Sequence, residues 1–437
     1  MDDQTAVTVR PARRVAGRLR VPSDKSISHR AVILSALARG TSEIRNLTPG
    51  QDVEATIDCL RRLGVSVEMA PAASPGVPPS WRVRGAGGPG GLAAAAELDA
   101  RNSGTTTRVL MGVLAGANGT YRILGDASLE RRPMGRVVDP LTRMGAQIVT
   151  TDGHLPAIVT GQPLHGIDYR LPVASAQVKS AILLAGVFAS GETIVREPVP
   201  TRNHTELALM SFGVRVDHEP GLARVRGGQS LGATTIDVPG DPSSAAFWAA
   251  AAAALPGSEI DVDDVALNPT RTGFLDVLRR FGAVVETEPA CSSPGDAEPR
   301  GRIRVSYGEV GTVRIDAAEV PGVIDELPVL AALATHGGRL TVTGAAELRV
   351  KESDRISALG AGLRAMGGQI EEFPDGFHVD GHTRLTGGAV DAAGDHRLAM
   401  AFSIAALGAT GDTRIEGASC VAVSYPGFFD VLAGLCQ

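Results

Sequence analysis

A short pattern of hydrophobic and polar positions recurs along the chain: an apolar run with helical spacing, a glycine, and an alternating run typical of a β-strand. It occurs at CLRRLGVSVEM, LTRMGAQIVT, LMSFGVRVD, LRRFGAVVE and LRAMGGQIEE, with glycines Gly64, Gly145, Gly213, Gly282 and Gly367, and a shortened copy, LAGLC, lies near the C-terminus. Each copy predicts a helix that ends at a glycine in the left-handed conformation and is followed by a strand.

The spacing of these glycines indicates a repeated architecture. They lie roughly 70 to 85 residues apart, and six copies of about 73 residues would fill the 437-residue chain. Junctions of this kind are also common in any α/β protein, which is the alternative explanation. The regular spacing favours an α/β protein built from repeated mixed modules.

Two segments rich in proline and glycine, Pro71–Gly91 and Glu288–Gly301, are predicted as loops. The first contains a formal GxGxxG that begins at Gly85. A dinucleotide-binding fingerprint needs a strand before it and a helix after it, and the low complexity here argues against both. The stretch Pro239–Pro242 is a plausible crossover between domains, with Asp241 capping the helix that follows.

Composition narrows the class of protein. The chain is long enough for two or three domains, and its 43% hydrophobic content excludes disorder as the main state. A net charge of −6 argues against a nucleic-acid-binding protein, the alternative that the many arginines raise. There is no run of 18 apolar residues that could span a membrane, and the first residues lack the basic-then-apolar order of a signal peptide. The four cysteines do not have the spacing of a metal site. We expect a cytoplasmic protein that does not bind membranes and uses no metal or cofactor.

Lysine is rare in this chain. Of the 42 basic residues, 39 are arginine, and the three lysines are Lys25, Lys179 and Lys351. Codon bias that favours arginine, with three lysines left at random positions, would explain this number. However, all three lie in dense polar segments, where a compact, rotatable ammonium can do what a planar guanidinium cannot. We therefore expect at least two of them to be functional.

Five polar segments each precede an apolar, alanine-rich stretch. They are PSDKSISHR (22–30), RNSGTTTR (101–108), SAQVKS (175–180), RVKESDR (349–355) and GDHR (394–397). In the first, Ser23 or Asp24 can cap a helix, and Ser26 and Arg30 share one face of it. In the second, Gly104 would allow a ligand to approach the backbone closely. Helix starts with nearby cations attract phosphate and carboxylate groups.

Two acidic segments are candidates for proton transfer. Lys351 and Arg355 are four residues apart, so on a helix they would share a face with Glu352 beside them. A carboxylate among cations can donate or accept a proton, although alternating charges on an exposed helix would look the same. Asp325 precedes another apolar run and is either a helix cap or a catalytic base. Together the segments predict a site for small anions with several charges.

These segments, in this order, closely resemble the EPSP synthase (3-phosphoshikimate 1-carboxyvinyltransferase) family, and the match extends from Pro22 to the end of the chain. The resemblance implies transfer of the enolpyruvyl group of phosphoenolpyruvate to the 5-hydroxyl of shikimate 3-phosphate, with release of phosphate, in aromatic amino acid biosynthesis. It implies an α/β, two-domain inverse barrel-like fold with three βαβαββ repeats per domain and the active site in the interdomain cleft. The domains would be residues 1–22 plus 241–437, with the catalytic carboxylates, and residues 23–240, which bind shikimate 3-phosphate.

The resemblance also assigns roles to single residues. Asp325 would accept the hydroxyl proton, Glu352 would protonate the methylene carbon of phosphoenolpyruvate, and Lys25 would contact both substrates. Residues implied to bind shikimate 3-phosphate are Lys25, Ser26, Arg30, Ser175, Ala176, Gln177, Thr201 or Arg202, and Lys351. Residues implied to bind phosphoenolpyruvate are Gly104, Arg132, Arg355 and Arg397. Glyphosate would compete with phosphoenolpyruvate.

Some expectations stay open at this point. Lys179 is shared with one branch of the family only, so we interpret it as structural or as a support for the residues that bind substrate. Val423 stands where many members have a lysine that contacts phosphoenolpyruvate. The related enolpyruvyl transferases that act on UDP-N-acetylglucosamine usually carry a reactive loop cysteine, and no cysteine lies between Cys59 and Cys291 here. We expect a monomer.

Overall fold

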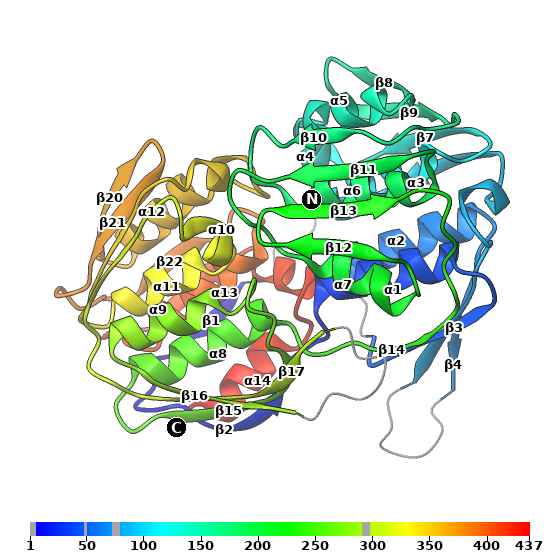
Figure 1. Ribbon diagram of the computed structural model, residues 1–437. Helices are drawn as coiled ribbons and strands as arrows, with labels where there is room; N and C mark the ends of the chain where they lie inside the picture. Colours follow the sequence, from blue (N-terminus) through cyan, green and yellow to red (C-terminus); the bar gives the residue numbers. More distant parts are fainter. Residues whose placement is uncertain (1–5, 48–49, 72–78, 291–297) are drawn as a thin grey trace. The chain divides into compact units, whose positions relative to one another are not determined.

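The chain divides into two compact units. The computed structural model describes residues 6–47, 50–71, 79–290 and 298–437. Residues 23–239 and Glu298 belong to one unit, called the central unit here, and the described residues of 1–22, 240–291 and 299–437 form the other, the discontinuous unit. Figure 1 shows the course of the chain within each of them.

The central unit consists of three modules with the order βαβαββ. The first contains β14 (Thr235–Asp237), α1 (Lys25–Leu37), β3 (Thr41–Arg45), α2 (Gln51–Arg62), β4 (Ser66–Ala70) and β5 (Ser80–Arg84). After the short η1 (Pro89–Gly91), the second contains β6 (Ala95–Asp99), α3 (Gly104–Leu114), β7 (Thr120–Leu124), α4 (Ala127–Glu130), α5 (Gly135–Arg143), β8 (Gln147–Thr151) and β9 (His154–Thr160). The third contains β10 (Asp168–Arg170), α6 (Ala176–Phe188), β11 (Glu192–Arg196), α7 (His204–Ser211), β12 (Val216–Glu219) and β13 (Leu222–Arg226).

The discontinuous unit repeats this order. Its first module contains β2 (Ala16–Arg20), α8 (Pro242–Ala254), β15 (Glu259–Ala266), α9 (Gly273–Phe281), β16 (Val284–Pro289) and β17 (Arg300–Ser306). Its second contains β18 (Thr312–Ile315), α10 (Val320–Val323), α11 (Leu327–Ala334), β19 (Arg339–Val342), η2 (Ala346–Val350), α12 (Arg355–Ala365), β20 (Gln369–Phe373) and β21 (Gly376–Asp380). Its third contains β22 (Gly388–Asp391), α13 (His396–Ala406), β23 (Thr413–Glu416), η3 (Ala418–Val423) and α14 (Phe428–Leu435), and is completed by β1 (Val7–Val9).

Among the described residues, strand pairing is the same in five of the six modules. The first two strands are parallel and flank a crossover helix, and the last two form an antiparallel hairpin, as in the order β6-β7-β9-β8. The third module of the discontinuous unit has the sheet β1-β23-β22 among the described residues, in which β1 takes the place of the hairpin. The prediction of a repeated α/β architecture is confirmed.

The five glycines of the repeated pattern follow helices in each case. Gly64, Gly145, Gly213, Gly282 and Gly367 have φ values of 84°, 105°, 83°, 108° and 85°. In this left-handed region a Cβ is unfavourable, so glycine is the residue that ends the helix and lets the next strand begin at once. These five predicted helix–glycine–strand junctions are therefore confirmed. The prediction for the shortened copy LAGLC is wrong, because Gly434 lies inside α14, which continues to Leu435, and no strand follows it among the described elements.

The first crossover helix of every module is buried. α8 is an extreme case, because every residue from Pro242 to Ala254 is buried, and its sequence is almost entirely alanine and aromatic residues. In the discontinuous unit, α8, α11 and α13 pack against one another (Figure 1). In the central unit α3 packs on α6, where a Cβ on Gly112 would lie 2.3 Å from the carbonyl oxygen of Ala181. Apolar, small residues thus allow the inner helices to approach closely.

One sequence prediction about loops is wrong in part. Pro71–Gly91 was expected to be a single loop, but Ser80–Arg84 is the strand β5, which pairs with β3 and β4. The alternation of SWRVR gives this strand one buried side, and the proline-rich flank concealed the pattern. The stretches 72–78 and 291–297 lie outside the described residues. The second predicted loop is also wrong in part, because Glu288 belongs to β16 and Arg300 to β17. Among the described helices, none is long and apolar enough to cross a membrane.

Candidate functional site

The polar segments singled out in the sequence lie at corresponding points of the modules, at or just before the N-termini of helices. Side-chain caps begin five of the six inner helices: Asp24 on α1, Ser103 on α3, Ser175 on α6, Asp241 on α8 and Asp395 on α13. Each accepts a hydrogen bond from a backbone N–H two or three residues later. Helix starts leave further N–H groups available, and the helix dipole makes them favourable places for anions.

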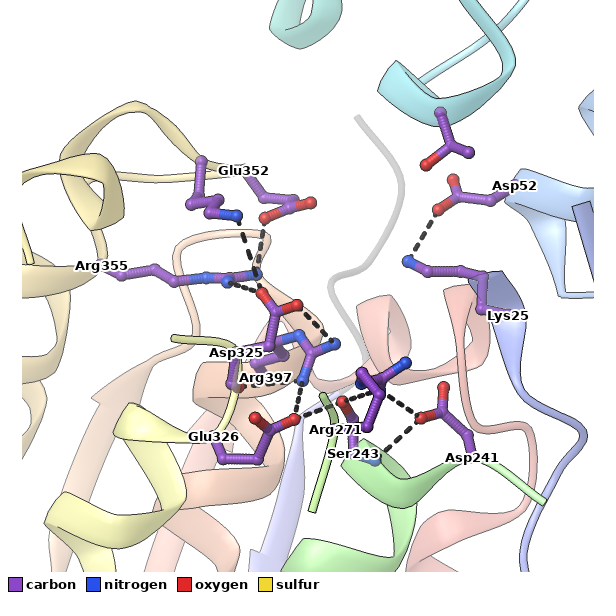
Figure 2. A network of polar contacts seen from close by, with 12 residues as sticks. Lys25, Asp52, Asp241, Ser243, Arg271, Asp325, Glu326, Glu352, Arg355 and Arg397 are labelled. Carbon is purple, nitrogen blue, oxygen red and sulfur yellow. Dashed lines mark hydrogen bonds and ion pairs between the residues drawn. The ribbon is translucent and has the colours of Figure 1, made fainter. Parts of the chain in front are cut away.

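Lys25 lies in the first turn of α1 and forms an ion pair with Asp52 in the first turn of α2. The distance from Lys25 Nζ to Asp52 Oδ2 is 2.9 Å, and the two side chains are 23% and 15% exposed (Figure 2). Sequence reasoning did not identify Asp52. Its place in a helix start, two residues after Gly50, is the only sequence signal that it gives. The ion pair holds the Lys25 ammonium at the N-terminal ends of α1 and α2.

Arg30 is buried and held by three hydrogen bonds. It donates to the Ser26 carbonyl oxygen at 2.8 Å, to Thr205 Oγ1 at 2.7 Å and to Ser180 Oγ at 2.7 Å. Burial lowers the pKa of Arg30 to about 10, against the attraction of Glu206. The guanidinium remains charged near neutral pH, in a fixed orientation that links α1 to α6 and α7.

Gly104 begins α3 beside two guanidinium groups. A Cβ at this position would lie 2.8 Å from Nη1 of Arg108 and 3.4 Å from Nη1 of Arg132. Arg132 donates to Asn102 Oδ1 at 2.8 Å. Gly104 therefore leaves room for two guanidinium groups at the helix start. The sequence had predicted only that a ligand could approach the backbone closely at this glycine.

The first turn of α6 is tied to the first turn of α3. Gln177 Oε1 accepts from Arg108 Nη1 at 2.6 Å, and Gln177 Nε2 donates to Thr105 Oγ1 at 3.0 Å. Ala176 is the first residue of α6, next to its cap Ser175. These contacts place the predicted residues Gly104 and Gln177 in one connected group of the central unit.

Thr201 and Arg202 lie in the loop between β11 and α7. The Thr201 hydroxyl donates a hydrogen bond to Glu197, and the Thr201 backbone N–H lies 3.4 Å from Glu197 Oε2. The hydroxyl proton of Thr201 is thus already used within the protein.

Asp325 lies just before α11, among three cations of the discontinuous unit. Its carboxylate oxygens are 3.7 Å from Lys351 Nζ, 3.5 Å from Arg355 Nη1 and 3.9 Å from Arg397 Nη2 (Figure 2). Arg397 Nη1 also donates to the Asp325 carbonyl oxygen at 2.9 Å. The cap position of α11 is occupied by Glu326, so the alternative that Asp325 is a helix cap is wrong.

Glu352 and Asp395 bind opposite parts of one guanidinium. Arg355 Nη2 donates to Glu352 Oε2 at 2.5 Å, and Arg355 Nε donates to Asp395 Oδ2 at 2.7 Å. Burial lowers the pKa of Arg355, but attraction to Asp395 and Glu352 outweighs burial and raises the pKa above its usual value. Glu352, 25% exposed, is the accessible member of this group.

The prediction that Lys351 and Arg355 share a helix face is wrong. α12 begins at Arg355, because Asp354 caps it by accepting from the Ser357 N–H at 3.1 Å, and η2 has already ended at Val350. Lys351 and Glu352 therefore lie in the irregular segment between two helices. Both cations nevertheless approach Asp325, because the chain turns there.

A buried polar group that sequence reasoning missed lies next to Arg397. Glu326, 2% exposed, accepts a hydrogen bond from the Ser243 hydroxyl and is 3.9 Å from Arg397 Nη1. Arg271 donates to Ser243 Oγ at 2.8 Å and to Asp241 Oδ1 at 3.0 Å (Figure 2). The sequence had assigned Asp241 only a capping role, and Arg271 lies in a segment without a recognisable motif.

Within the discontinuous unit, the structure thus brings together five predicted residues: Asp325, Lys351, Glu352, Arg355 and Arg397. Two carboxylates among three cations can bind an anion and exchange protons with it. Among the described residues, no group of three or more His, Cys, Asp or Glu side chains could hold a metal ion.

Comparisons with known proteins agree on one family. The model of the EPSP synthase (3-phosphoshikimate 1-carboxyvinyltransferase) family matches residues 9–432. The chain is 49% identical over 425 residues to the 3-phosphoshikimate 1-carboxyvinyltransferase of Acidithiobacillus ferrooxidans, covering 97% of this chain and 96% of that one. It is 48% identical over 420 residues to the corresponding protein of Xanthomonas euvesicatoria, covering 95% and 93%. The solved structure of EPSP synthase from Acinetobacter baumannii aligns with a TM-score of 0.84 at 39% identity, covering 99% and 98%.

Proposed function

Since this chain belongs to the EPSP synthase family, we propose that it transfers the enolpyruvyl group of phosphoenolpyruvate to the 5-hydroxyl of shikimate 3-phosphate and releases phosphate. It is a transferase of aromatic amino acid biosynthesis with the two-domain inverse α/β barrel fold of its relatives. The observation that carries the proposal is the group around Asp325, where three cations lie within 4 Å of the Asp325 carboxylate and one of them, Arg355, also binds Glu352. This group has the components that the reaction requires: an acid, a base and fixed positive charges.

The central unit supplies the residues proposed for shikimate 3-phosphate. Lys25, Ser26 and Arg30 at the start of α1, and Ser175, Ala176 and Gln177 at the start of α6, bind its phosphate and ring, with Thr201 or Arg202 from the β11–α7 loop. The fixed guanidinium of Arg30 and the helix caps support this assignment. Lys351 of the discontinuous unit completes the set.

Phosphoenolpyruvate is bound by cations at other helix starts. Arg132 beside Gly104, Arg355 and Arg397 neutralise its phosphate and carboxylate, and Lys25 reaches it as well. Arg355 is suited to this because its orientation is fixed by two carboxylates, so little reorganisation accompanies binding.

Proton transfer is assigned to the two carboxylates of the Asp325 group. Asp325 accepts the proton of the 5-hydroxyl as the oxygen attacks C2 of phosphoenolpyruvate, and Glu352 donates a proton to C3. Bound phosphoenolpyruvate brings negative charge to the cations around Glu352, which favours the protonated form that an acid needs. The product of addition is a tetrahedral ketal, and loss of phosphate together with one C3 proton restores the double bond.

The chemistry also requires the two substrates to meet, so we propose that residues of both units act on one pair of substrates. The cytoplasmic location and the monomeric state stay predictions from the sequence.

The test is a phosphate-release assay with phosphoenolpyruvate alone, shikimate 3-phosphate alone, and both together. We expect release only with both substrates and no release when UDP-N-acetylglucosamine replaces shikimate 3-phosphate. Release that is equally fast with phosphoenolpyruvate alone, or with the sugar nucleotide, would contradict the proposed transfer.

A further inference from the structure

Lys179 lies buried between two carboxylates. Its Nζ is 2.9 Å from Glu197 Oε2 and 2.8 Å from Glu206 Oε1, and all three side chains are 2% exposed. The two carboxylates come from different elements: Glu197 follows β11, and Glu206 is in α7. One ammonium thus joins α6, on which it lies, to both ends of the β11–α7 connection.

Glu197 is also the anchor of the loop that carries Arg202. One of its oxygens accepts from the Thr201 hydroxyl, and the other, which binds Lys179, faces the Thr201 backbone N–H at 3.4 Å. The conformation of residues 197–202 therefore depends on where the Glu197 carboxylate is held. Lys179 is the cation that holds it.

Glu206 binds Lys179 directly, and its negative charge also acts on Arg30. The neighbour of Glu206, Thr205, accepts from Arg30, and the neighbour of Lys179, Ser180, accepts from Arg30 as well. Arg30, Lys179, Glu197 and Glu206 together carry two positive and two negative charges in a buried region. Loss of the ammonium alone would leave the buried carboxylates of Glu197 and Glu206 without the cation that binds them both.

We infer that Lys179 is a positioning residue for shikimate 3-phosphate: through Glu197 it orders the loop with Thr201 and Arg202, and through Glu206 it keeps Arg30 in its bonded orientation. The inference rests on the proposed function. Packing alone does not explain the residue, because burying an ammonium requires desolvation that an apolar side chain of the same length would avoid. Lys179 touches none of the residues proposed for proton transfer, so it acts on binding rather than on chemistry.

The decisive variant is Lys179→Met, which keeps the length of the side chain and removes the charge. We expect the KM and the Kd of shikimate 3-phosphate to rise about tenfold or more, while kcat and the KM of phosphoenolpyruvate stay within about threefold. The matched control is Thr193→Val on β11, whose buried hydroxyl has no hydrogen-bond partner among the described residues. This control should bind both substrates like the wild type. A wild-type Kd for shikimate 3-phosphate in folded Lys179→Met protein would overturn the inference.

Two further variants keep the inference testable if Lys179→Met folds poorly. In Lys179→Met/Glu206→Gln the lost positive charge is matched by a lost negative charge. This double variant should bind shikimate 3-phosphate several-fold more tightly than Lys179→Met does. If Lys179→Met does not fold, the double variant should still fold and bind shikimate 3-phosphate. Glu197→Gln keeps the shape of the side chain but removes its charge, so its contacts with Lys179 and Thr201 become weaker. This variant should raise the KM of shikimate 3-phosphate and leave the KM of phosphoenolpyruvate unchanged. Equal losses for both substrates in Glu197→Gln would indicate a merely structural role and contradict the inference.

Failure of the inference can be told apart from failure of the proposed function. If the wild-type protein releases no phosphate with both substrates, the proposed function is wrong. If Lys179→Met behaves like the wild type, only the inference is wrong.

Discussion

Asp395 and Arg355 form a fully buried ion pair in which Arg355 Nε donates to Asp395 Oδ2 at 2.7 Å. The same carboxylate caps α13 by accepting from the Arg397 backbone N–H at 3.0 Å. One aspartate therefore fixes both arginines that are proposed to bind phosphoenolpyruvate. A helix cap in most proteins contributes only to stability; here it also binds an arginine of the proposed anion site.

Asp395→Asn tests this double role. Asparagine can still cap α13 but cannot balance the buried charge of Arg355, so the guanidinium will turn toward Glu352 and Asp325. We expect kcat/KM for phosphoenolpyruvate to fall by about 10- to 100-fold, with the KM of shikimate 3-phosphate nearly unchanged. The control is Asp354→Asn at the cap of α12, whose side chain is 40% exposed and binds Arg349 instead of Arg355. Equal steady-state kinetics of the two variants would contradict the role of Asp395.

Gly104→Ala should weaken the binding of phosphoenolpyruvate without harming the fold. The new methyl group would lie 2.8 Å from Arg108 Nη1 and 3.4 Å from Arg132 Nη1, so both guanidinium groups must move. We expect the KM of phosphoenolpyruvate to rise about tenfold, and the thermal stability to stay equal or increase slightly because alanine favours helix. Gly135→Ala at the start of α5 is the matched control, since nothing lies within 4 Å of its added Cβ. An unchanged KM for Gly104→Ala would contradict the proposed contact of Arg132 with this substrate.

Glu352→Gln separates proton donation from binding. The amide keeps a hydrogen-bond acceptor for Arg355 but cannot donate a proton to C3 of phosphoenolpyruvate. We expect kcat to fall by about 10²- to 10⁴-fold, the usual contribution of a general acid, with the substrate dissociation constants changed only a few-fold. The exposed Glu371→Gln serves as the control. If kcat of Glu352→Gln stays within a few-fold of the wild type, another group must donate the proton.

His29 makes the stability of the protein sensitive to acid. Burial lowers the pKa of this histidine to about 3, with the charges of Lys25 and Arg30 acting in the same direction and Asp52 opposing them. The folded chain thus binds fewer protons at His29 than the unfolded chain, whose histidine titrates near 6.5. The free energy of unfolding must therefore decrease as the pH falls from about 6.5 toward 3, by up to about 1.4 kcal/mol per pH unit from this residue.

His29→Gln, which cannot titrate, should show a shallower loss of stability between pH 6.5 and 4 in urea unfolding experiments. Parallel pH profiles of variant and wild type would mean that His29 does not account for the acid sensitivity.

Much of the fold could be predicted from local signals. A glycine that must adopt a positive φ, as Gly282 does, ends a helix irrespective of its surroundings, so the repeated junctions were visible in the sequence. The predicted helix caps Asp24 and Asp241 are likewise determined by contacts within a few residues. The strand β5 escaped because its five residues lie beside a proline-rich stretch, and its place in the sheet depends on pairing with β3, nearly 40 residues away.

The site was predicted less completely, for a related reason. Motifs identified residues such as Arg397 and Glu352, which lie in distinctive segments. Asp52, Arg271 and Glu326 gain their importance only from partners far away in the chain, as when Ser243 donates to Glu326. The error at Lys351 shows the converse: spacing suggested a helix, but the cap at Asp354 began the helix later.

A crystal structure of the protein with shikimate 3-phosphate and glyphosate bound is the measurement that tests the central claim most directly. We predict that Lys25, Arg30 and Gln177 of the central unit and Lys351, Arg355 and Arg397 of the discontinuous unit will all contact this one pair of ligands. Ligands held by the residues of one unit alone, with Asp325 and Glu352 remote from both, would contradict it.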